Sequence, residues 1–154
     1  MKKLAEPLTR AQCLLVKSEC AASNLRRATR AIGRIFDRAI APAGLKETQF
    51  NVLIGLSLTG EVPLLRLAQV LGLDRTTLTR NLGPLERDGL LSSVPGTDQR
   101  VRLLRLTEEG RDALRQAYPL WEAAQRKVVN ALGEGTWKEL LRGLQATHQV
   151  QSKG

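Results

Sequence analysis

Residues that enzymes use for catalysis are scarce in this sequence. Its 154 residues include a single histidine, His148, and two cysteines, Cys13 and Cys20. A Ser-His or Cys-His pair would depend on a histidine in a polar tail, and two cysteines with one distant histidine are too few ligands for zinc. Because Gly-rich phosphate-binding motifs are missing as well, we expect no catalysis, no metal and no cofactor.

Aromatic residues and long apolar runs are also rare. Aromatics make up 3% of the chain, too few for the stacking platforms that bind single-stranded nucleic acid. No stretch approaches the roughly 18 apolar residues that a membrane-spanning helix needs. The segment 8–16 is interrupted by polar residues and does not form a signal peptide. We therefore expect a cytoplasmic protein, and a reducing compartment fits its two cysteines.

Positive charge, by contrast, is abundant. Twenty-four Lys and Arg residues against 15 Asp and Glu residues give a formal net charge of +9. This excess favours an anionic partner, either nucleic acid or a membrane surface. The membrane alternative is the weaker one, because the basic helix near the N-terminus lacks an aromatic-rich insertion face. The length suits a single domain over residues 1–154.

The stretch from Val62 to Thr107 carries the strongest pattern. Apolar residues spaced three and four apart predict a helix over 64–71, and Gly72 suits the turn that ends it. Asp74 is placed to cap a second helix that begins at Arg75, with an apolar residue on either side at the staple positions. The turn between the helices is very short, so they must cross steeply, as in a helix-turn-helix.

The second helix has one leucine face and one polar face. Leu78, Leu82 and Leu85 recur at helical spacing and predict the buried side. Hydroxyl and guanidinium groups on the other side suit the edges of base pairs in the major groove. The alternative is ordinary solvated surface, although β-branched residues are a poor choice for a helix with no other role. The residues predicted to contact DNA here are Arg75, Thr76, Thr77, Thr79 and Arg80.

A β-hairpin is predicted after the second helix. Pro84 removes a helical hydrogen bond and is expected to bend the helix. Strands are predicted over 90–94 and 101–106, joined by a turn-forming stretch with an acid and a base at its tip. Two adjacent leucines leave open which face of the second strand is buried. The hairpin residues predicted to reach DNA are Asp98, Gln99, Arg100 and Arg102.

Two runs of this stretch resemble the multiple-antibiotic-resistance regulator (MarR) family of bacterial transcription factors: LAQVLGLDRTTLTRNLGPLERDGLL and GTDQRVRLLRLTEEGR. The hallmark positions are the Asp98-x-Arg100 pair and the LT-x-x-G element of Leu106, Thr107 and Gly110. The resemblance implies a mainly α (α+β) fold, in which long dimerisation helices flank a winged helix-turn-helix.

The resemblance also implies roles for the two DNA-contacting elements. The helix from Arg75 would enter the major groove of double-stranded DNA. Arg100 would reach the minor groove from the wing, oriented by Asp98. Charge and spacing by themselves show only that the hairpin has a basic tip.

Long amphipathic helices are predicted on both sides of the winged unit, which spans 48–106. Residues 1 to about 12 are predicted as a loose arm, and apolar stripes follow over 13–44 and 107–148, the second broken at Gly133 and Gly135. These stripes need each other or a second copy to be buried. The resemblance implies a homodimer on an imperfect palindrome, with recognition helices about 34–36 Å apart.

The first part of the winged unit is predicted as a helix capped by Thr48. Its apolar residues continue through Leu58, and Gly60 ends it. A loop is predicted over 59–63. This helix is expected to be the floor on which the helix-turn-helix packs.

Four arginines recur every four residues in the first long helix: Arg26, Arg30, Arg34 and Arg38. They are interpreted either as a solvated helix face or as a counter-charge for DNA phosphates or an anionic effector. In the family, small ligands such as aromatic acids bind between the dimer helices and the winged unit. By resemblance, Arg26 or Arg30 would meet the carboxylate, unless no effector exists.

The two cysteines have three interpretations. On one continuous helix Cys13 and Cys20 would lie about 10 Å apart, beyond the roughly 7 Å limit for a disulfide. Each would still be free to pair with its symmetry mate. Peroxide-sensing members of the family carry a reactive cysteine near this helix, but their tyrosine partners are absent here. Inert and mostly buried thiols are the default.

Together these features predict a sequence-specific DNA-binding transcriptional regulator. We expect a homodimeric repressor that a small aromatic or anionic effector releases. The alternatives are a thiol-based redox regulator acting through Cys13 or Cys20, and a winged-helix module that binds an acidic protein.

Overall fold

The computed structural model describes residues 7–96 and 101–148. The chain divides after Ile35 into two compact units, which are described separately. Within the described ranges, none of the helices is both long and apolar enough to cross a lipid bilayer.

The first unit contains two helices where one was predicted. α1 (Arg10–Glu19) begins two residues before the predicted end of the loose arm, because Thr9 and Gln12 form a capping box. The backbone is extended at Cys20, with ψ 109°, and α2 (Ala21–Ile40) follows. The prediction of one continuous helix through both cysteines was therefore wrong. α2 crosses the boundary between the units.

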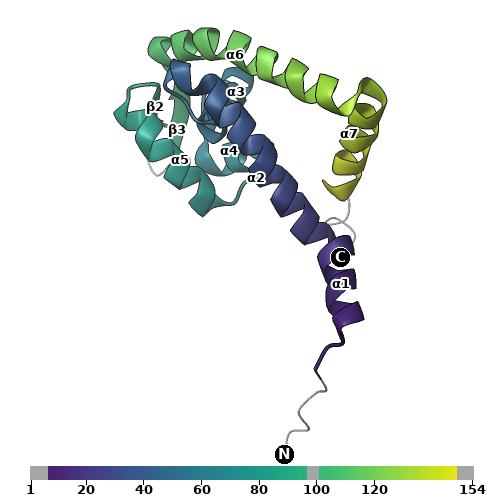
Figure 1. The fold of residues 1–154 in the computed structure, drawn as a ribbon. Coiled ribbons are helices and arrows are strands. Elements are labelled where there is room, and N and C mark those ends of the chain that lie inside the picture. Colours follow the sequence, from purple (N-terminus) through teal and green to yellow (C-terminus); the bar gives the residue numbers. More distant parts are fainter. Residues whose placement is uncertain (1–6, 97–100, 149–154) are drawn as a thin grey trace, which may run out of the picture. The chain divides into compact units, whose positions relative to one another are not determined.

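The second unit begins with the last turn of α2 and contains every remaining element (Figure 1). A short 3-10 turn, Ala41–Ala43, links α2 to the winged unit. The elements that follow are α3 (Glu47–Thr59), β1 (Val62–Pro63), α4 (Leu64–Leu71), α5 (Arg75–Arg87), β2 (Leu91–Pro95), β3 (Arg102–Leu106), α6 (Glu108–Leu132) and α7 (Glu134–His148).

Several predicted boundaries are corrected. α3 starts at Glu47 and not after Thr48, because the carboxylate of Asp37 on α2 accepts the Glu47 backbone N–H at 2.8 Å. The predicted loop over 59–63 contains β1, which pairs with β3. Both hairpin strands begin one residue later than predicted. Gly133 ends α6 with φ 81°, whereas Gly135 lies inside α7 and breaks nothing.

The three strands form an antiparallel sheet in the order β1-β3-β2. Leu91 pairs with Leu106, and Val62 pairs with Leu104. These four side chains are buried, so they mark the inner face that the sequence left undecided. Leu103 is half-buried and Arg105 is exposed on the opposite face. The sheet is thus covered on one side only.

The main core lies between this sheet and the helices α3, α4 and α5. Its fully buried side chains include Leu53 and Leu56 from α3, Leu67 from α4, and Leu78 and Leu85 from α5. α3 contributes five buried residues and contacts α4, α5, α6 and β3. The prediction that α3 is the floor of the helix-turn-helix is confirmed. Burial of these leucines holds α5 in place, at about 25 cal/mol per Å² of apolar surface.

Candidate nucleic-acid interface

The start of α5 is fixed by its own side chains. Asp74 is the N-cap, and its carboxylate accepts the Thr77 backbone N–H at 2.8 Å and the Thr77 hydroxyl at 2.6 Å. Two hydrogen bonds from Thr77 lower the pKa of the Asp74 carboxyl: the larger effect comes from the hydroxyl and the next from the backbone N–H. A negative charge at this position also interacts favourably with the positive end of the helix dipole. The predicted cap and the predicted first residue, Arg75, are both confirmed.

A tight turn joins α4 to α5. Gly72 has φ 63° and ψ 30°, a left-handed conformation that favours glycine. The backbone N–H of Leu73 donates to the Ala68 carbonyl at 2.9 Å, which closes the C-terminus of α4. On the underside of α5, Leu78 and Leu85 are fully buried and Leu82 is nearly so. The polar side of α5 is therefore held outward.

The outward side of α5 is a row of arginines and threonines. Arg75, Thr76, Thr79 and Arg80 are all exposed. No ion pair within the described part of the chain involves either arginine. The Thr79 hydroxyl donates to the Arg75 carbonyl at 2.8 Å, which directs its methyl group away from that bond. We name these four residues the α5 polar face.

Thr77 does not belong to the α5 polar face. It is half-buried, and its hydroxyl is engaged with Asp74. It turns toward α3, where it shares a surface groove with Asn81. The sequence grouped Thr77 with its neighbours because helical spacing alone places it at the edge of the polar side. The structure makes it the residue that holds the N-cap.

The hairpin that follows is described up to its tip. The Gly96 backbone N–H donates to the Val101 carbonyl at 2.8 Å and closes the two strands. Arg102 lies across the hairpin, where its Nε donates to the Ser93 hydroxyl at 2.6 Å and its Nη2 to the Ser93 carbonyl at 2.9 Å. The other predicted wing contacts, Asp98, Gln99 and Arg100, lie outside the described residues.

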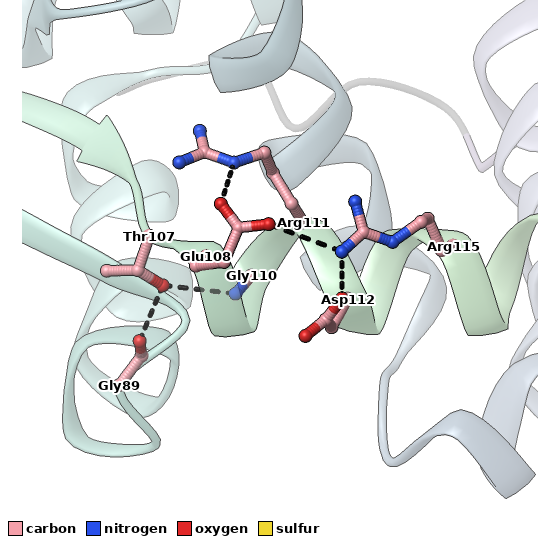
Figure 2. Close-up of polar contacts among 7 residues, drawn as sticks. All are labelled: Gly89, Thr107, Glu108, Gly110, Arg111, Asp112 and Arg115. Carbon is pink, nitrogen blue, oxygen red and sulfur yellow. Dashed lines mark hydrogen bonds and ion pairs between the residues drawn. The ribbon is translucent and has the colours of Figure 1, made fainter.

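A polar corner joins the hairpin to the end of α5 and to the start of α6 (Figure 2). The Thr107 hydroxyl donates to the Gly89 carbonyl at 2.7 Å and accepts the Gly110 backbone N–H at 3.0 Å. Its backbone N–H donates to the Leu90 carbonyl at 3.3 Å. The predicted cap role of Thr107 is confirmed, and the same side chain also holds the turn after α5.

Gly110 lies in the tightest part of this corner. A Cβ atom added there would be 2.0 Å from the Leu90 carbonyl oxygen and 2.7 Å from Leu106 Cδ1. Only a glycine fits at this distance from the backbone. The LT-x-x-G element thus has a structural reason, because it lets α6 start directly against the loop that follows α5.

Exposed ion pairs extend from the corner along α6. Arg111 Nε lies 2.7 Å from Glu108 Oε2, and Arg115 Nη2 lies 3.3 Å from Glu108 Oε1. Arg115 also pairs with Asp112, as Figure 2 shows. The hydrogen bonds from Arg111 and Arg115 lower the pKa of Glu108. These pairs are solvent-exposed and contribute little stability individually.

The remaining predicted site residues lie in the first unit. Arg26 and Arg30 are exposed on α2. Cys13 is exposed and Cys20 is half-buried, so the prediction of mostly buried thiols was wrong. The reason is that α1 buries none of its residues within the chain. Cys13 lies within α1 and Cys20 is its C-cap, whose backbone N–H donates to the Val16 carbonyl, so the separation of about 10 Å expected between the two residues still applies.

Sequence reasoning missed one feature of the winged unit. A groove of about 390 Å³ runs along α3 and is bounded by α4 and α5. Glu47 and Asn51 lie at one end of it. Their i, i+4 spacing was readable from the sequence, but the positions of the other walls depend on how the three helices pack.

A short helix-turn-helix with an exposed polar second helix, followed by an antiparallel hairpin, defines a winged helix-turn-helix protein. Comparison with solved structures agrees. The M. tuberculosis transcriptional regulator MosR, solved in complex with DNA, is 40% identical over 88% of this chain and 98% of its own, with a TM-score of 0.79. The transcriptional repressor CouR, bound to a 23-mer DNA duplex, is 27% identical over 93% of this chain and 99% of its own, with a TM-score of 0.78.

The fold extends to a more distant structure. A mutant of MarR from E. coli, complexed with operator DNA, shares 21% identity over 87% of this chain and 97% of its own, with a TM-score of 0.78. No protein-family model matches the sequence. The chain belongs to the MarR family of transcriptional regulators.

Proposed function

We propose that this protein is a sequence-specific regulator that binds double-stranded DNA as a homodimer on a pseudo-palindromic operator, acts as a repressor and is released by a small effector. The observation that carries the proposal is the α5 polar face, which two threonines form with two arginines that have no ion pair among the described residues, above a fully packed leucine underside. MosR and CouR, which cover most of this chain, are DNA-bound regulators.

The chemistry of the α5 polar face suits the major groove. A guanidinium group forms a bidentate pair with guanine O6 and N7, and a threonine methyl packs against a thymine methyl. The net charge of +9 adds attraction to phosphates that does not depend on sequence. Arg102 is held by the hairpin at Ser93, which suits a contact near the wing. Arg100, Asp98 and Gln99 remain proposed wing contacts.

Unburied apolar side chains support dimerisation. In the first unit, Leu14, Leu15 and Val16 on α1 are more than half exposed, at 53%, 55% and 58%. α2 adds Ile32 and Ile35, exposed at 36% and 43%. In the second unit, none of the α7 residues from 134 to 147 is buried. Runs of exposed apolar side chains on long helices mark interaction surfaces.

A gel shift with the DNA upstream of the protein's own gene tests the proposal. A shift that a specific unlabelled duplex reverses, and that a scrambled duplex does not, is the expected result. Equal binding to both duplexes would contradict sequence-specific recognition. Binding to an acidic protein without any DNA shift would favour the interaction-module alternative.

The proposed dimer should dissociate when a charged side chain is introduced into its apolar surface. Ile32→Glu places a carboxylate in the exposed apolar stripe of α2 and is expected to convert the dimer to monomer in sedimentation equilibrium. Operator affinity should fall at least tenfold, because one half-site then supplies only part of the contacts. Leu65→Glu, on α4 and 63% exposed, is the matched control. A dimer that persists in the Ile32 variant would place the interface elsewhere.

Arg26 and Arg30 on α2 are the proposed counter-charges for an anionic effector. Both are exposed. Thermal shift with a panel of phenolic acids tests this role, because a ligand of the folded state must raise the melting temperature. The Arg26→Ala, Arg30→Ala double variant should lose that shift.

A thiol switch is a second candidate, favoured by the surroundings of Cys20. Cys20 immediately precedes α2, and its carbonyl accepts the Asn24 backbone N–H at 3.0 Å. Hydrogen bonds from the hydroxyl and the backbone N–H of Ser23, with the charge of Arg26, lower the pKa of the thiol. A thiolate at a helix N-terminus is the reactive form of cysteine. Cys13 is exposed and is the proposed partner thiol across a dimer.

The switch predicts that Cys20→Ser abolishes any loss of operator binding on treatment with hydrogen peroxide. The wild-type protein should lose binding and recover it with a thiol reductant. Cys13→Ser distinguishes a sulfenic acid, which needs only Cys20, from a disulfide between Cys20 and Cys13 of a second copy, which needs both. An unchanged oxidant response in Cys20→Ser would remove this candidate.

A further inference from the structure

The groove along α3 lies wholly inside the second unit. Its volume of about 390 Å³ falls in the size range of small-molecule sites. Three helices supply its walls. Its lining includes Ile54 and Leu58 from α3, Val70 and Leu71 from α4, and Thr77 and Asn81 from α5.

The groove has an apolar body and one acidic end. Glu47 is the charged side chain among the described residues that line it, and none of these is a lysine or an arginine. Glu47 is half-buried, and this burial raises its pKa. The Asn51 side-chain amide donates to its carboxylate. A buried carboxylate gains from a hydrogen-bond donor or a positive charge and is destabilised by a second anion.

We propose that this groove binds a small aromatic or aliphatic amphiphile with a cationic or hydrogen-bond-donating head, and that the bound molecule lowers the affinity of the protein for DNA by acting on α5. Its apolar body would lie against Ile54, Val70 and Leu71, with its head at Glu47. The effect on DNA rests on the proposed function. This ligand class is opposite in charge to the anions that the arginines of α2 would accept.

The link to DNA binding is direct, because two wall residues belong to α5. Thr77 holds the N-cap through Asp74, and the Asn81 side-chain amide donates to the Thr77 carbonyl at 3.0 Å. A ligand against Thr77 and Asn81 therefore touches the turn of α5 that carries the α5 polar face. A displacement of this turn moves Arg75 and Thr76 relative to the major groove of the bound DNA.

A small molecule fits the groove better than a chain segment does. The volume of about 390 Å³ lies near the lower end of the range for small-molecule sites. One acidic group at one end gives a single charged anchor, whereas an extended peptide would need backbone partners along its length. Leu58 is 79% exposed and Val70 is 45% exposed at the groove, so a ligand gains apolar contact there.

The test compares three indole probes that differ only in their head group: tryptamine, tryptophol and indole-3-acetate. Titration into ¹⁵N-labelled full-length protein should shift the amide signals of Gly55, Thr77 and Asn81, with tryptamine binding most tightly and indole-3-acetate most weakly. Calorimetry gives the affinities. Operator affinity is measured in the same buffer, with and without tryptamine, and should fall at least threefold at saturation.

Two variants test the two ends of the groove. Leu58→Trp fills the groove from an exposed position and should abolish probe binding, whereas Leu65→Trp on α4, which does not line it, should not. Glu47→Gln should weaken tryptamine binding at least fivefold and leave tryptophol unchanged. Circular dichroism and sedimentation of each variant confirm that fold and oligomeric state are retained.

Several results would overturn the inference. They are signal shifts confined to residues away from the groove, full probe binding by Leu58→Trp, or equal affinity for tryptamine and indole-3-acetate. A change of oligomeric state in Leu58→Trp alone would assign the groove to a second copy of the chain. Probe binding in the groove without any change in operator affinity would overturn the link to DNA. If the protein binds no operator at all, the proposed function fails, while the titration still decides whether the groove is a site.

Discussion

Gly110→Ala lowers the stability of the protein by roughly 2–4 kcal/mol, the upper range for overpacking of a tightly packed position. The added Cβ would lie 2.0 Å from the Leu90 carbonyl oxygen, which is backbone and cannot rotate away. α6 must then move from the loop after α5, and the Thr107 bonds to Gly89 and Gly110 stretch. The higher helix propensity of alanine offsets only about 1 kcal/mol.

The measurement is thermal unfolding at fixed protein concentration. A fall in melting temperature of roughly 5–15 °C is expected for a chain of this size. Gly83→Ala is the matched control, because Gly83 lies in α5 with no atom within 4 Å of an added Cβ. That variant should be as stable as the wild type or more stable. A melting temperature of Gly110→Ala within 2 °C of the wild type would show that the backbone at this corner can shift to accommodate a Cβ atom with little loss of stability.

Arg80→Ala is expected to weaken operator binding by roughly 5- to 150-fold, which corresponds to the 1–3 kcal/mol of one bidentate base contact. Arg80 is exposed on α5, and no ion pair within the described residues uses its charge. Truncation to alanine leaves the leucine underside of α5 intact, so the loss should appear in binding and not in stability.

Fluorescence anisotropy with the operator and with a scrambled duplex separates two kinds of contact. If Arg80 contacts a base, the variant loses more affinity for the operator than for the scrambled duplex. If it contacts only a phosphate, both affinities fall alike and the salt slope drops by about 1. Arg126→Ala is the control, since Arg126 lies on α6 and pairs with Glu122. Unchanged operator affinity in Arg80→Ala would exclude the α5 polar face as a main contact.

The helix-turn-helix was predictable because its signals are local. The Asp74 cap, the left-handed Gly72 and the spacing of Leu78, Leu82 and Leu85 each act within one or two turns. The bounds of α4 and α5 agree with the prediction for that reason. The cap of α3 was mispredicted at Thr48, because the group that stabilises its first turn is Asp37, ten residues away on another helix.

The break at Cys20 shows a different limit. A long helical pattern was expected over 13–44, and nothing in it marked an interruption at Cys20. The interruption depends on backbone geometry, and Asn24 stabilises it by donating from its side chain to the Ser18 and Cys20 carbonyls. The burial of both thiols was mispredicted, because none of the residues of α1 is buried.

The sequence by itself determined the helix-turn-helix with the hairpin after it, the start and the polar face of α5, and the excess of positive charge, because caps, helical period and composition need no distant residue. Tertiary packing decided which face of β3 is buried, why Gly110 must be a glycine, and that Thr77 turns toward α3. It also created the acidic-ended groove, whose walls come from three helices that only their shared leucine core brings together.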